Sequence, residues 1–427
     1  MKVKATVTLT LILIAVLSAS SIFFAEANFT PLPELPTPIY IRADGTVDPP
    51  EAPIHRVDST YTLTSDINNT IEIQCPNIVL DGDGFTVTKP SVSTLGLMMP
   101  IGWLPGVHIE SLSNVKVTNV VFDGCITGVA VENGTEVSIS QNIMRNCESC
   151  IVVMSSSDVA IVGNSMTAFG VGINLLPLNP DSSNPLRIRI EGNQIVGDGE
   201  QAPAAPAPQP NQYGIWGTFS DSKVSANNFS NIEGIGLYNL ASNNLIADNN
   251  FQNNYEGILV NTNQEIFFGN VFCGNNFDHN SVNVVIPYIR NYSPDSNRWD
   301  NGSVGNYWSD YSGSDSNGDG VGDTPYLLQT VYTNYEQQTN VTVEEGQDNY
   351  PAMVPFSISI PAGAQATPTS APAQEPEALP IQTVAVVVLV TVTAIAVVGV
   401  AVYLKRHHQP PKSAVSMAFF HGSRNLV

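Results

Sequence analysis

The sequence predicts an all-β protein that forms a single-stranded parallel β-helix, a coil in which each turn of about 22 residues adds one layer of short strands. Three observations predict this fold. Large apolar residues recur with gaps of 22, 22, 29, 34, 22 and 21 residues. A series of glycine positions runs in step with them, and an Asn lies two residues before six of the seven apolar positions.

The apolar series is Phe122, Met144, Met166, Ile195, Phe229, Phe251 and Phe272. The glycine series is Gly106, Gly128, Cys150, Gly172, Gly214, Gly236 and Gly257. The Asn series is Asn142, Asn164, Asn193, Asn227, Asn249 and Asn270. Each repeat holds short Val/Ile runs with period-two alternation and leaves no room for a helix of ten or more residues, so the repeat is built from strands.

Stacking of the repeats assigns a place to each series. Equivalent residues lie one interstrand spacing of roughly 4.8 Å apart, so the apolar series forms an internal column. The Asn series is expected at a corner, where Asn tolerates left-handed backbone and stacked amides hydrogen-bond along the coil axis. The two long gaps are read as loop insertions at 177–187 and 199–212, after which the repeat resumes in register.

The two ends of the chain predict export and a membrane anchor. The apolar N-terminus ending in Ala25-Glu26-Ala27 resembles a secretory signal peptide cleaved before Asn28; an uncleaved anchor is the alternative. Near the other end, 22 uncharged residues precede Lys405, a stop-transfer pattern with its basic flank in the cytoplasm. The predicted segments are a signal peptide at 1–27, a Pro-rich segment at 28–57, the β-helix at 58–290, a C-terminal cap at 291–360, a Pro/Ala/Thr stalk at 361–380, a transmembrane helix at 383–404 and a cytoplasmic tail at 405–427.

The predicted extracellular part is strongly acidic and contains every cysteine. Residues 28–404 carry 10 Lys/Arg and 37 Asp/Glu, a balance that repels nucleic acid and other polyanions and favours cations. Cys125 and Cys147 are one repeat apart, so their Cα atoms should stack within disulfide range, and we predict a bond between them. A pair of buried thiols and a Cys147–Cys150 bond are the alternatives. Glycosylation is expected at sequons that begin at Asn28, Asn68, Asn133, Asn228, Asn291, Asn301 and Asn340.

The chain resembles the NosD-type, or CASH, group of right-handed parallel β-helix proteins, especially their archaeal cell-surface members. The corners with Asn before an apolar residue and the segment Asn77-Ile-Val-Leu-Asp-Gly82 carry part of the resemblance. More specific are the sequences GNYWSDYSGSDSNGDGVGDTPY at 305–326 and DNYP at 348–351. The resemblance covers roughly 58–356 and implies a pectin-lyase-like coil. It implies no single activity, because this fold occurs in lyases, hydrolases, epimerases, adhesins and copper-loading proteins.

The Asp-rich loop in the C-terminal cap is a candidate calcium site. Its side-chain oxygens alternate along the chain and a Gly occupies the sixth position, as in the first half of a calcium loop. The twelfth position is Tyr326 rather than a bidentate Glu, so the match is incomplete. A cluster of Asx-turns that ends the coil is the alternative. The candidate metal ligands are Asp315, Asn317, Asp319 and Asp323.

Catalysis and copper binding have weaker support in the sequence. Glu110 and Glu132 occupy the same position in adjacent repeats, where stacked carboxylates suit a retaining glycosidase, but two solvated surface acids are the favoured interpretation. Signatures of polygalacturonases and mannuronan epimerases are not visible. Copper would need Met, His or Cys ligands together, and only Met98-Met99 near Trp103 remain outside the predicted core.

A carbohydrate-binding surface is predicted on the outward side of the glycine series. Counting two residues onward from each glycine position places Trp216 and Tyr238 side by side, with Tyr213 flanking them. Aromatic faces beside polar groups bind sugar rings by apolar contact and hydrogen bonds. The alternative is that the 199–212 insertion buries these rings. We therefore expect a single-pass type I cell-surface protein that binds a glycan or another envelope component, with a polysaccharide-active enzyme and a copper-binding or purely structural envelope protein as alternatives.

Overall fold

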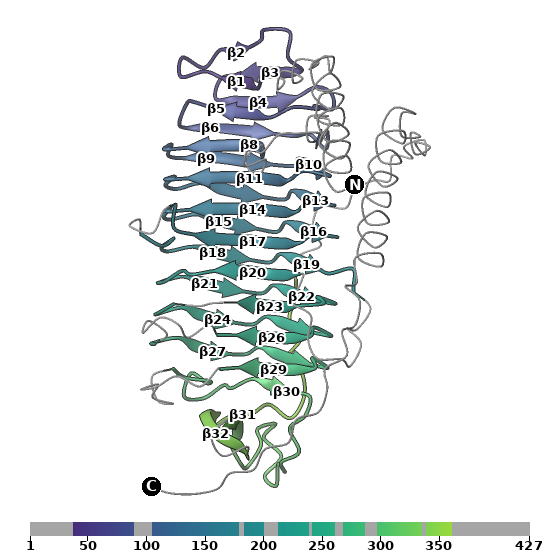
Figure 1. The fold of residues 1–427 in the computed structure, drawn as a ribbon, viewed down its shortest axis with the longest axis vertical. Coiled ribbons are helices and arrows are strands. Elements are labelled where there is room, and N and C mark those ends of the chain that lie inside the picture. Colours follow the sequence, from purple (N-terminus) through teal and green to yellow (C-terminus); the bar gives the residue numbers. More distant parts are fainter. Residues whose placement is uncertain are drawn as a thin grey trace, which may run out of the picture. The chain divides into compact units, whose positions relative to one another are not determined.

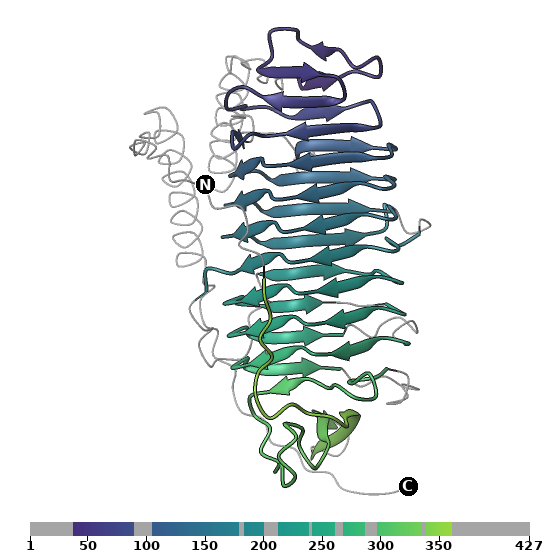
Figure 2. The ribbon, with the colours of Figure 1, turned by 180° about the vertical axis from the view of Figure 1, so that it is seen from behind.

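The computed structural model describes residues 37–88, 105–178, 183–199, 212–238, 241–260, 268–286, 297–334 and 339–360. These residues form three long sheets, here called A, B and C, whose strands stack layer upon layer (Figures 1 and 2). The chain visits the three sheets in turn, so the strands of the repeating turns pair in parallel with their equivalents from neighbouring turns, whereas the first layers also contain antiparallel pairs, one in sheet A and one in sheet B. The all-β fold of stacked parallel strands is therefore confirmed.

Sheet A has eleven strands and carries the candidate site. In spatial order they are β2 (Val47–Asp48), β1 (Ile39–Ile41), β5 (Ile71–Ile73), β8 (Pro105–Glu110), β11 (Thr127–Glu132), β14 (Ser149–Met154), β17 (Val171–Leu176), β20 (Tyr213–Gly217), β23 (Ile235–Tyr238), β26 (Glu256–Leu259) and β29 (Val282–Val285). All of its pairs are parallel except β1 with β2.

Sheets B and C complete each turn. Sheet B consists of β3 (Ile54–Val57), β4 (Thr60–Leu63), β6 (Ile78–Asp81), β9 (Val115–Thr118), β12 (Ser138–Ser140), β15 (Ala160–Val162), β18 (Arg189–Glu191), β21 (Lys223–Ser225), β24 (Leu245–Ala247) and β27 (Val271–Cys273). Sheet C consists of β7 (Thr86–Thr88), β10 (Val121–Asp123), β13 (Ile143–Arg145), β16 (Ser165–Thr167), β19 (Gln194–Val196), β22 (Asn228–Ser230), β25 (Asn250–Gln252), β28 (Asn276–Asp278) and β30 (Tyr307–Trp308).

The first and last layers differ from the repeating turns. The predicted Pro-rich segment at 28–57 contributes β1, β2 and β3 to the first layers of sheets A and B. At the other end, β31 (Tyr326–Asn334) and β32 (Thr339–Asp348) form an antiparallel hairpin.

Asp348, the last residue of β32, is fully buried and accepts hydrogen bonds from the backbone N of Asn306 (2.7 Å) and from Nε1 of Trp308 (2.9 Å). Burial raises the pKa of Asp348 to about 6.

The internal apolar column follows the predicted series except at its last member. Phe229, Phe251 and Phe277 stack with centroid separations of 4.9 and 5.2 Å and are fully buried. Phe272, predicted as the last member, instead pairs with Ile246 in sheet B. The prediction failed because this turn carries extra residues at 261–267, which lengthens the spacing from Phe251 to 26, and because two Asn-x-Phe sequences lie five residues apart.

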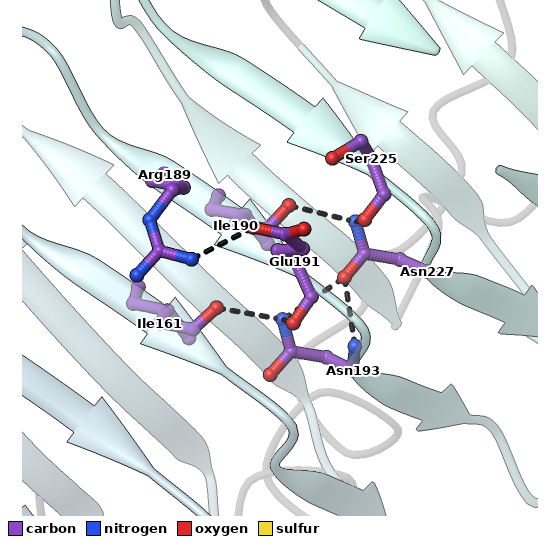
Figure 3. A network of polar contacts seen from close by, with 7 residues as sticks. All are labelled: Ile161, Arg189, Ile190, Glu191, Asn193, Ser225 and Asn227. Carbon is purple, nitrogen blue, oxygen red and sulfur yellow. Dashed lines mark hydrogen bonds and ion pairs between the residues drawn. The ribbon is translucent and has the colours of Figure 1, made fainter. Parts of the chain in front are cut away.

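A ladder of buried Asn side chains joins successive turns. In Figure 3, Nδ2 of Asn193 donates to Oδ1 of Asn227 (2.9 Å) and to the carbonyl of Ile161 (2.9 Å). Each amide thus satisfies backbone groups that would otherwise be buried without partners. The predicted hydrogen bonding along the axis is confirmed for Asn142, Asn164, Asn193, Asn227 and Asn249, and the ladder continues to Asn275 and Asn306.

Two details of the Asn prediction are wrong. Asn270 belongs to a second ladder, in which Asn244, Asn270 and Asn297 are hydrogen-bonded in turn. From Asn142 to Asn275 the left-handed backbone falls on the residue before the ladder Asn rather than on the Asn itself, with φ of 56° at Gln141 and 54° at Ala226. The corner therefore uses two residues, one that reverses the backbone and one that supplies the amide.

The glycine series permits close packing between turns at the start of the sheet A strands. A Cβ on Gly128 would lie 2.5 Å from the carbonyl oxygen of Cys150, and one on Gly214 would lie 2.3 Å from that of Gly236. Both separations are shorter than van der Waals contact, so a side chain would force the turns apart.

The described residues contain no helix long and apolar enough to cross a membrane, and the predicted signal peptide and membrane helix lie outside them.

Candidate functional site

The outward column of sheet A lies where the sequence places it. Successive Cα pairings connect equivalent positions on neighbouring strands, while their sequence neighbours, such as Val129 and Val131, are fully buried. The strand pairing confirms that register. The column consists of His108, Ala130, Val152, Asn174, Trp216, Tyr238 and Leu259.

Three aromatic side chains gather at one part of this column. Trp216 and Tyr238 pair directly across β20 and β23. The ring of Tyr213 lies 5.9 Å from that of Trp216 at 27°, and 5.6 Å from that of Tyr238 at 43°. All three side chains are partly exposed, so the described surface offers aromatic area that is not buried in the core. We call Tyr213, Trp216 and Tyr238 the aromatic cluster.

Asn174 adds a buried hydrogen-bond acceptor beside the aromatic cluster. It pairs with Trp216 across β17 and β20, and only 8% of its surface is exposed. Its Oδ1 is buried and has no hydrogen-bond partner. Because a buried polar atom without a partner is costly, such an atom on a partly open face indicates a position where a ligand donor would be accommodated. The sequence placed Asn174 in the column, but nothing in the sequence marks its oxygen as unpartnered.

Glu256 supplies a carboxyl group to the same face. It lies two strands beyond Tyr213 at the same position along sheet A, with Ile235 between them. Burial raises the pKa of Glu256. The pKa of Tyr213 is also raised, first by burial and then by the charges of Tyr238 and Glu256. Glu256 was not predicted from the sequence, because outward positions were counted onward from each glycine position and Glu256 precedes Gly257.

The two described ends of the 199–212 insertion are fixed to each other beside this face. Nε2 of Gln212 donates to the carbonyl oxygen of Phe169 and to Oδ1 of Asp198, both at 2.9 Å. Oε1 of Gln212 accepts from the backbone N of Glu233 at 3.2 Å. The insertion therefore leaves and rejoins the coil at a defined place next to Tyr213, and its residues 200–211 lie outside the described residues.

A second cluster on sheet A places His108 between two carboxylates. Nδ1 of His108 lies 2.8 Å from Glu72 and Nε2 lies 3.1 Å from Glu132. Burial lowers the pKa of His108, but the hydrogen bond and charge of Glu72, followed by those of Glu132, outweigh it and raise the pKa. A protonated ring donates to both carboxylates, so this cluster joins β5, β8 and β11 by ion pairs. The sequence missed Glu72, because 36 residues rather than 22 separate it from His108.

The weak catalytic candidates do not form an isolated carboxylate pair. Glu110 and Glu132 are neighbours in register, as predicted. Glu132 is buried and held by His108, whereas Glu110 is exposed. The two side chains thus differ in environment, and the one nearer the interior is occupied by an ion pair.

The carboxylates of Asp315 and Asp323 in the Asp-rich loop accept hydrogen bonds from other residues of the same loop. Oδ1 of Asp315 accepts from the backbone N of Gly318 (2.7 Å), and its Oδ2 accepts from that of Gly320 (2.9 Å). Asn317 donates through Nδ2 to Asp319 at 2.9 Å. Asp323 is held separately, by Oγ of Ser316 at 2.6 Å. These contacts match the Asx-turn alternative. Within the described parts of the chain, no group of three or more His, Cys, Asp or Glu side chains is arranged to hold a metal ion.

The candidate copper ligands are not gathered at one place in the described structure. Met144 and Met166 are fully buried in the internal column, as expected, and Met98 and Met99 lie outside the described residues. Among the described residues, no group of three or more His or Cys side chains is arranged to hold a metal ion such as copper.

All five cysteines are buried and are thiols in the structure, and the Cys125–Cys147 disulfide stays a prediction. Cys147 lies next to both of its candidate disulfide partners, Cys125 and Cys150. Hydrogen bonding, first with Cys125 and then with Cys150, lowers the pKa of the Cys147 thiol. Contact with Cys147 and burial raise the pKa of Cys125. Cys147 is therefore the member of this group that most readily forms a thiolate.

The predicted glycosylation sites fall into three groups. Asn68, Asn133 and Asn301 are exposed. Asn228 is partly buried, and its Nδ2 donates to Gln194 (3.2 Å) and Ser230 (2.9 Å). Asn28, Asn291 and the side chain of Asn340 lie outside the described residues.

A scan against family models matches residues 77–313 to the family described as periplasmic copper-binding protein (NosD). The match covers more than half of the 427 residues. The chain belongs to the NosD family. The resemblance inferred from the Asn corners and from the sequence at 305–326 is thereby confirmed, although the expected archaeal source has no support. A search of curated proteins finds no match.

Solved structures similar to this NosD-family chain have low identity to it. The A-module of mannuronan C-5 epimerase AlgE6 from Azotobacter vinelandii is 10% identical, with 56% of this chain and 81% of that chain covered and a TM-score of 0.30. Pectate lyase Pel9A is 14% identical, with 57% and 70% covered and a TM-score of 0.28. The Dettilon tailspike protein is 15% identical, with 65% and 67% covered and a TM-score of 0.28. Similarity at this level carries no argument about what this chain binds.

Proposed function

We propose that this NosD-family protein is an exported carbohydrate-binding protein whose site is the aromatic cluster of sheet A together with Asn174. One observation carries the proposal: Asn174, whose buried Oδ1 has no hydrogen-bond partner, neighbours Trp216 of the partly exposed aromatic cluster across β17 and β20. Aromatic faces contact the apolar faces of sugar rings, and an acceptor beside them orients a hydroxyl group. Both requirements are met by side chains on adjacent strands of a rigid sheet.

A glycan array tests this function. The full-length chain should bind a defined subset of glycans, and Trp216→Ala should abolish that binding. Tyr307→Ala is the matched control, because Tyr307 is a partly exposed aromatic residue on sheet C. Binding that survives Trp216→Ala, or no binding by the wild-type chain, would reject the proposal.

We further propose that the protein is held at the cell surface. A membrane helix at 383–404 is supported by the uncharged 22-residue run followed by Lys405 and Arg406. A signal peptide at 1–27 is supported by the apolar N-terminus that ends in Ala25-Glu26-Ala27, and a stalk at 361–380 by its Pro/Ala/Thr composition. The family description as periplasmic agrees with export. Fractionation of expressing cells tests the anchor: the chain should stay with membranes, and a chain truncated before residue 383 should be released.

Calcium at 315–323 remains part of the proposal. Its support is the alternating oxygens and the Gly at the sixth position, and its expected role is to stabilise the C-terminal cap. A cation held there would act on stability and not on the glycan site of sheet A.

A further inference from the structure

The charged residues of the described coil are distributed unequally among its three sheets. No described strand of sheet A contains Lys or Arg; these strands carry Asp48, Glu72, Glu110, Glu132 and Glu256, with His108 as the one basic side chain. The described strands of sheets B and C carry Arg56, Lys116, Arg145, Arg189 and Lys223.

Two of the arginines outside sheet A are paired with carboxylates. Arg145 pairs with Asp123 at 2.9 Å, and Arg189 pairs with Glu191 at 2.7 Å. Lys223 lies beside Arg189 on sheet B. His108 is engaged by two carboxylates. Among the strands that the structure describes, the face with the aromatic cluster therefore offers no cation to an acidic ligand.

Two side chains beside the rings present acceptor oxygens. Oδ1 of Asn174 can only accept a hydrogen bond, and an ionised Glu256 likewise only accepts. Sugar hydroxyl groups and the N–H of an acetamido group donate to such atoms. A uronate carboxylate only accepts, so it cannot donate to Oδ1 of Asn174, and it adds a negative charge to a face whose described strands carry carboxylates and no Lys or Arg.

Burial also disfavours a cationic ligand. Asn174 is almost completely buried and the three rings are partly buried, so a bound ammonium group would lose much of its hydration.

We infer that sheet A takes an uncharged glycan, built from neutral hexoses or N-acetylhexosamines, and rejects polyuronates. The inference rests on the proposed function, since it assigns a ligand class to the same site. Apolar contact with the aromatic cluster supplies the affinity, and the acceptors at Asn174 and Glu256 supply the selection for donors.

Calorimetric titration of the full-length chain with three oligosaccharides of equal length and linkage tests the inference. They differ only in the sugar unit, which is a hexose, an N-acetylhexosamine or a uronic acid. We expect at least one uncharged chain to bind, the uronate to bind more weakly by about tenfold or more, and Trp216→Ala to remove binding.

A charge-introducing variant provides the converse test. Val152 precedes Asn174 in the outward column and is partly exposed, so Val152→Arg adds a cation to this face. It should improve uronate binding relative to the uncharged chains, whereas Lys223→Ala on sheet B should leave the ratio unchanged. A uronate that binds best and depends on Trp216 would overturn the inference and leave the proposed function standing. Failure of every glycan on the array would reject the proposed function itself.

Discussion

Asn174 lies beside Trp216 on the neighbouring strand of sheet A, and its buried Oδ1 accepts no hydrogen bond. The Asn residues of the ladder are also buried, but their amides are fully used: Asn164 donates to the carbonyl of Ile139 (2.9 Å) and to Asn193 (3.0 Å), and accepts from Asn142 (3.0 Å). Two buried Asn residues of the same coil thus have opposite energetic roles. The ladder stabilises the fold, and Asn174 is a cost that binding can recover.

Paired substitutions test this difference. Asn174→Val, which copies the neighbouring Val152, should raise the free energy of unfolding by about 1–3 kcal/mol because it removes an unpartnered buried acceptor. Asn164→Val should lower it by roughly 2–4 kcal/mol because it leaves ladder groups unpartnered. Chemical denaturation measures both. A loss of stability in Asn174→Val as large as that in Asn164→Val would show that Asn174 is an ordinary structural residue.

The His108 cluster predicts a specific pH dependence of stability. The pKa of His108 in the folded chain is raised above its ordinary value of 6.5, so its contribution is fully present below about pH 6.5 and is lost as the pH rises through the folded-state pKa. The stability difference between wild type and His108→Gln should therefore shrink with rising pH. His55→Gln, at an exposed position in β3, is the control. A difference that grows with pH would contradict the assignment of charge to this cluster.

Thermal melts decide whether the Asp-rich loop binds calcium. If it does, the wild-type chain should melt at a higher temperature in calcium than in chelator, and Asp319→Ala should remove the difference. Asp44→Ala, at another exposed carboxylate in a turn with Thr46, should leave the calcium effect intact. Equal melting temperatures in calcium and chelator for the wild-type chain would reduce the loop to its internal hydrogen bonds.

The cysteine group predicts a disulfide in chain purified from an oxidising compartment. Cys147 lies within hydrogen-bonding distance of Cys125, and its lowered pKa favours the thiolate that attacks an oxidised partner. Peptide mapping without reduction should recover a linked Cys125–Cys147 pair. Both residues labelled as free thiols in denaturant would end this prediction, and a Cys147–Cys150 link would select the alternative.

The sequence predicted the fold and the register of the site, because a coil with a nearly constant period places equivalent residues next to each other. Trp216 and Tyr238 could therefore be paired from their 22-residue spacing alone. Prediction failed where insertions change the period. Because of the extra residues at 261–267, Phe272 was predicted in the internal column instead of Phe277. Because of those at 89–104, the pairing of Glu72 with His108 was not predicted.

Other features depend on three-dimensional contacts that spacing does not encode. The unpartnered oxygen of Asn174 and the burial of Glu256 result from how neighbouring side chains cover sheet A. The left-handed corner residue varies among Gln, Gly, Ala and Asp, so its position could not be read from residue type.

The most direct test of the proposed site is calorimetric titration of the best array glycan into four full-length chains: wild type, Asn174→Ala, Trp216→Ala and Tyr307→Ala. The account predicts that Trp216→Ala and Asn174→Ala each weaken binding by about tenfold or more, through loss of ring contact and of the acceptor. Tyr307→Ala should bind as the wild type does. Equal affinity of the wild-type and Trp216→Ala chains would show that the glycan binds elsewhere and would contradict the central claim.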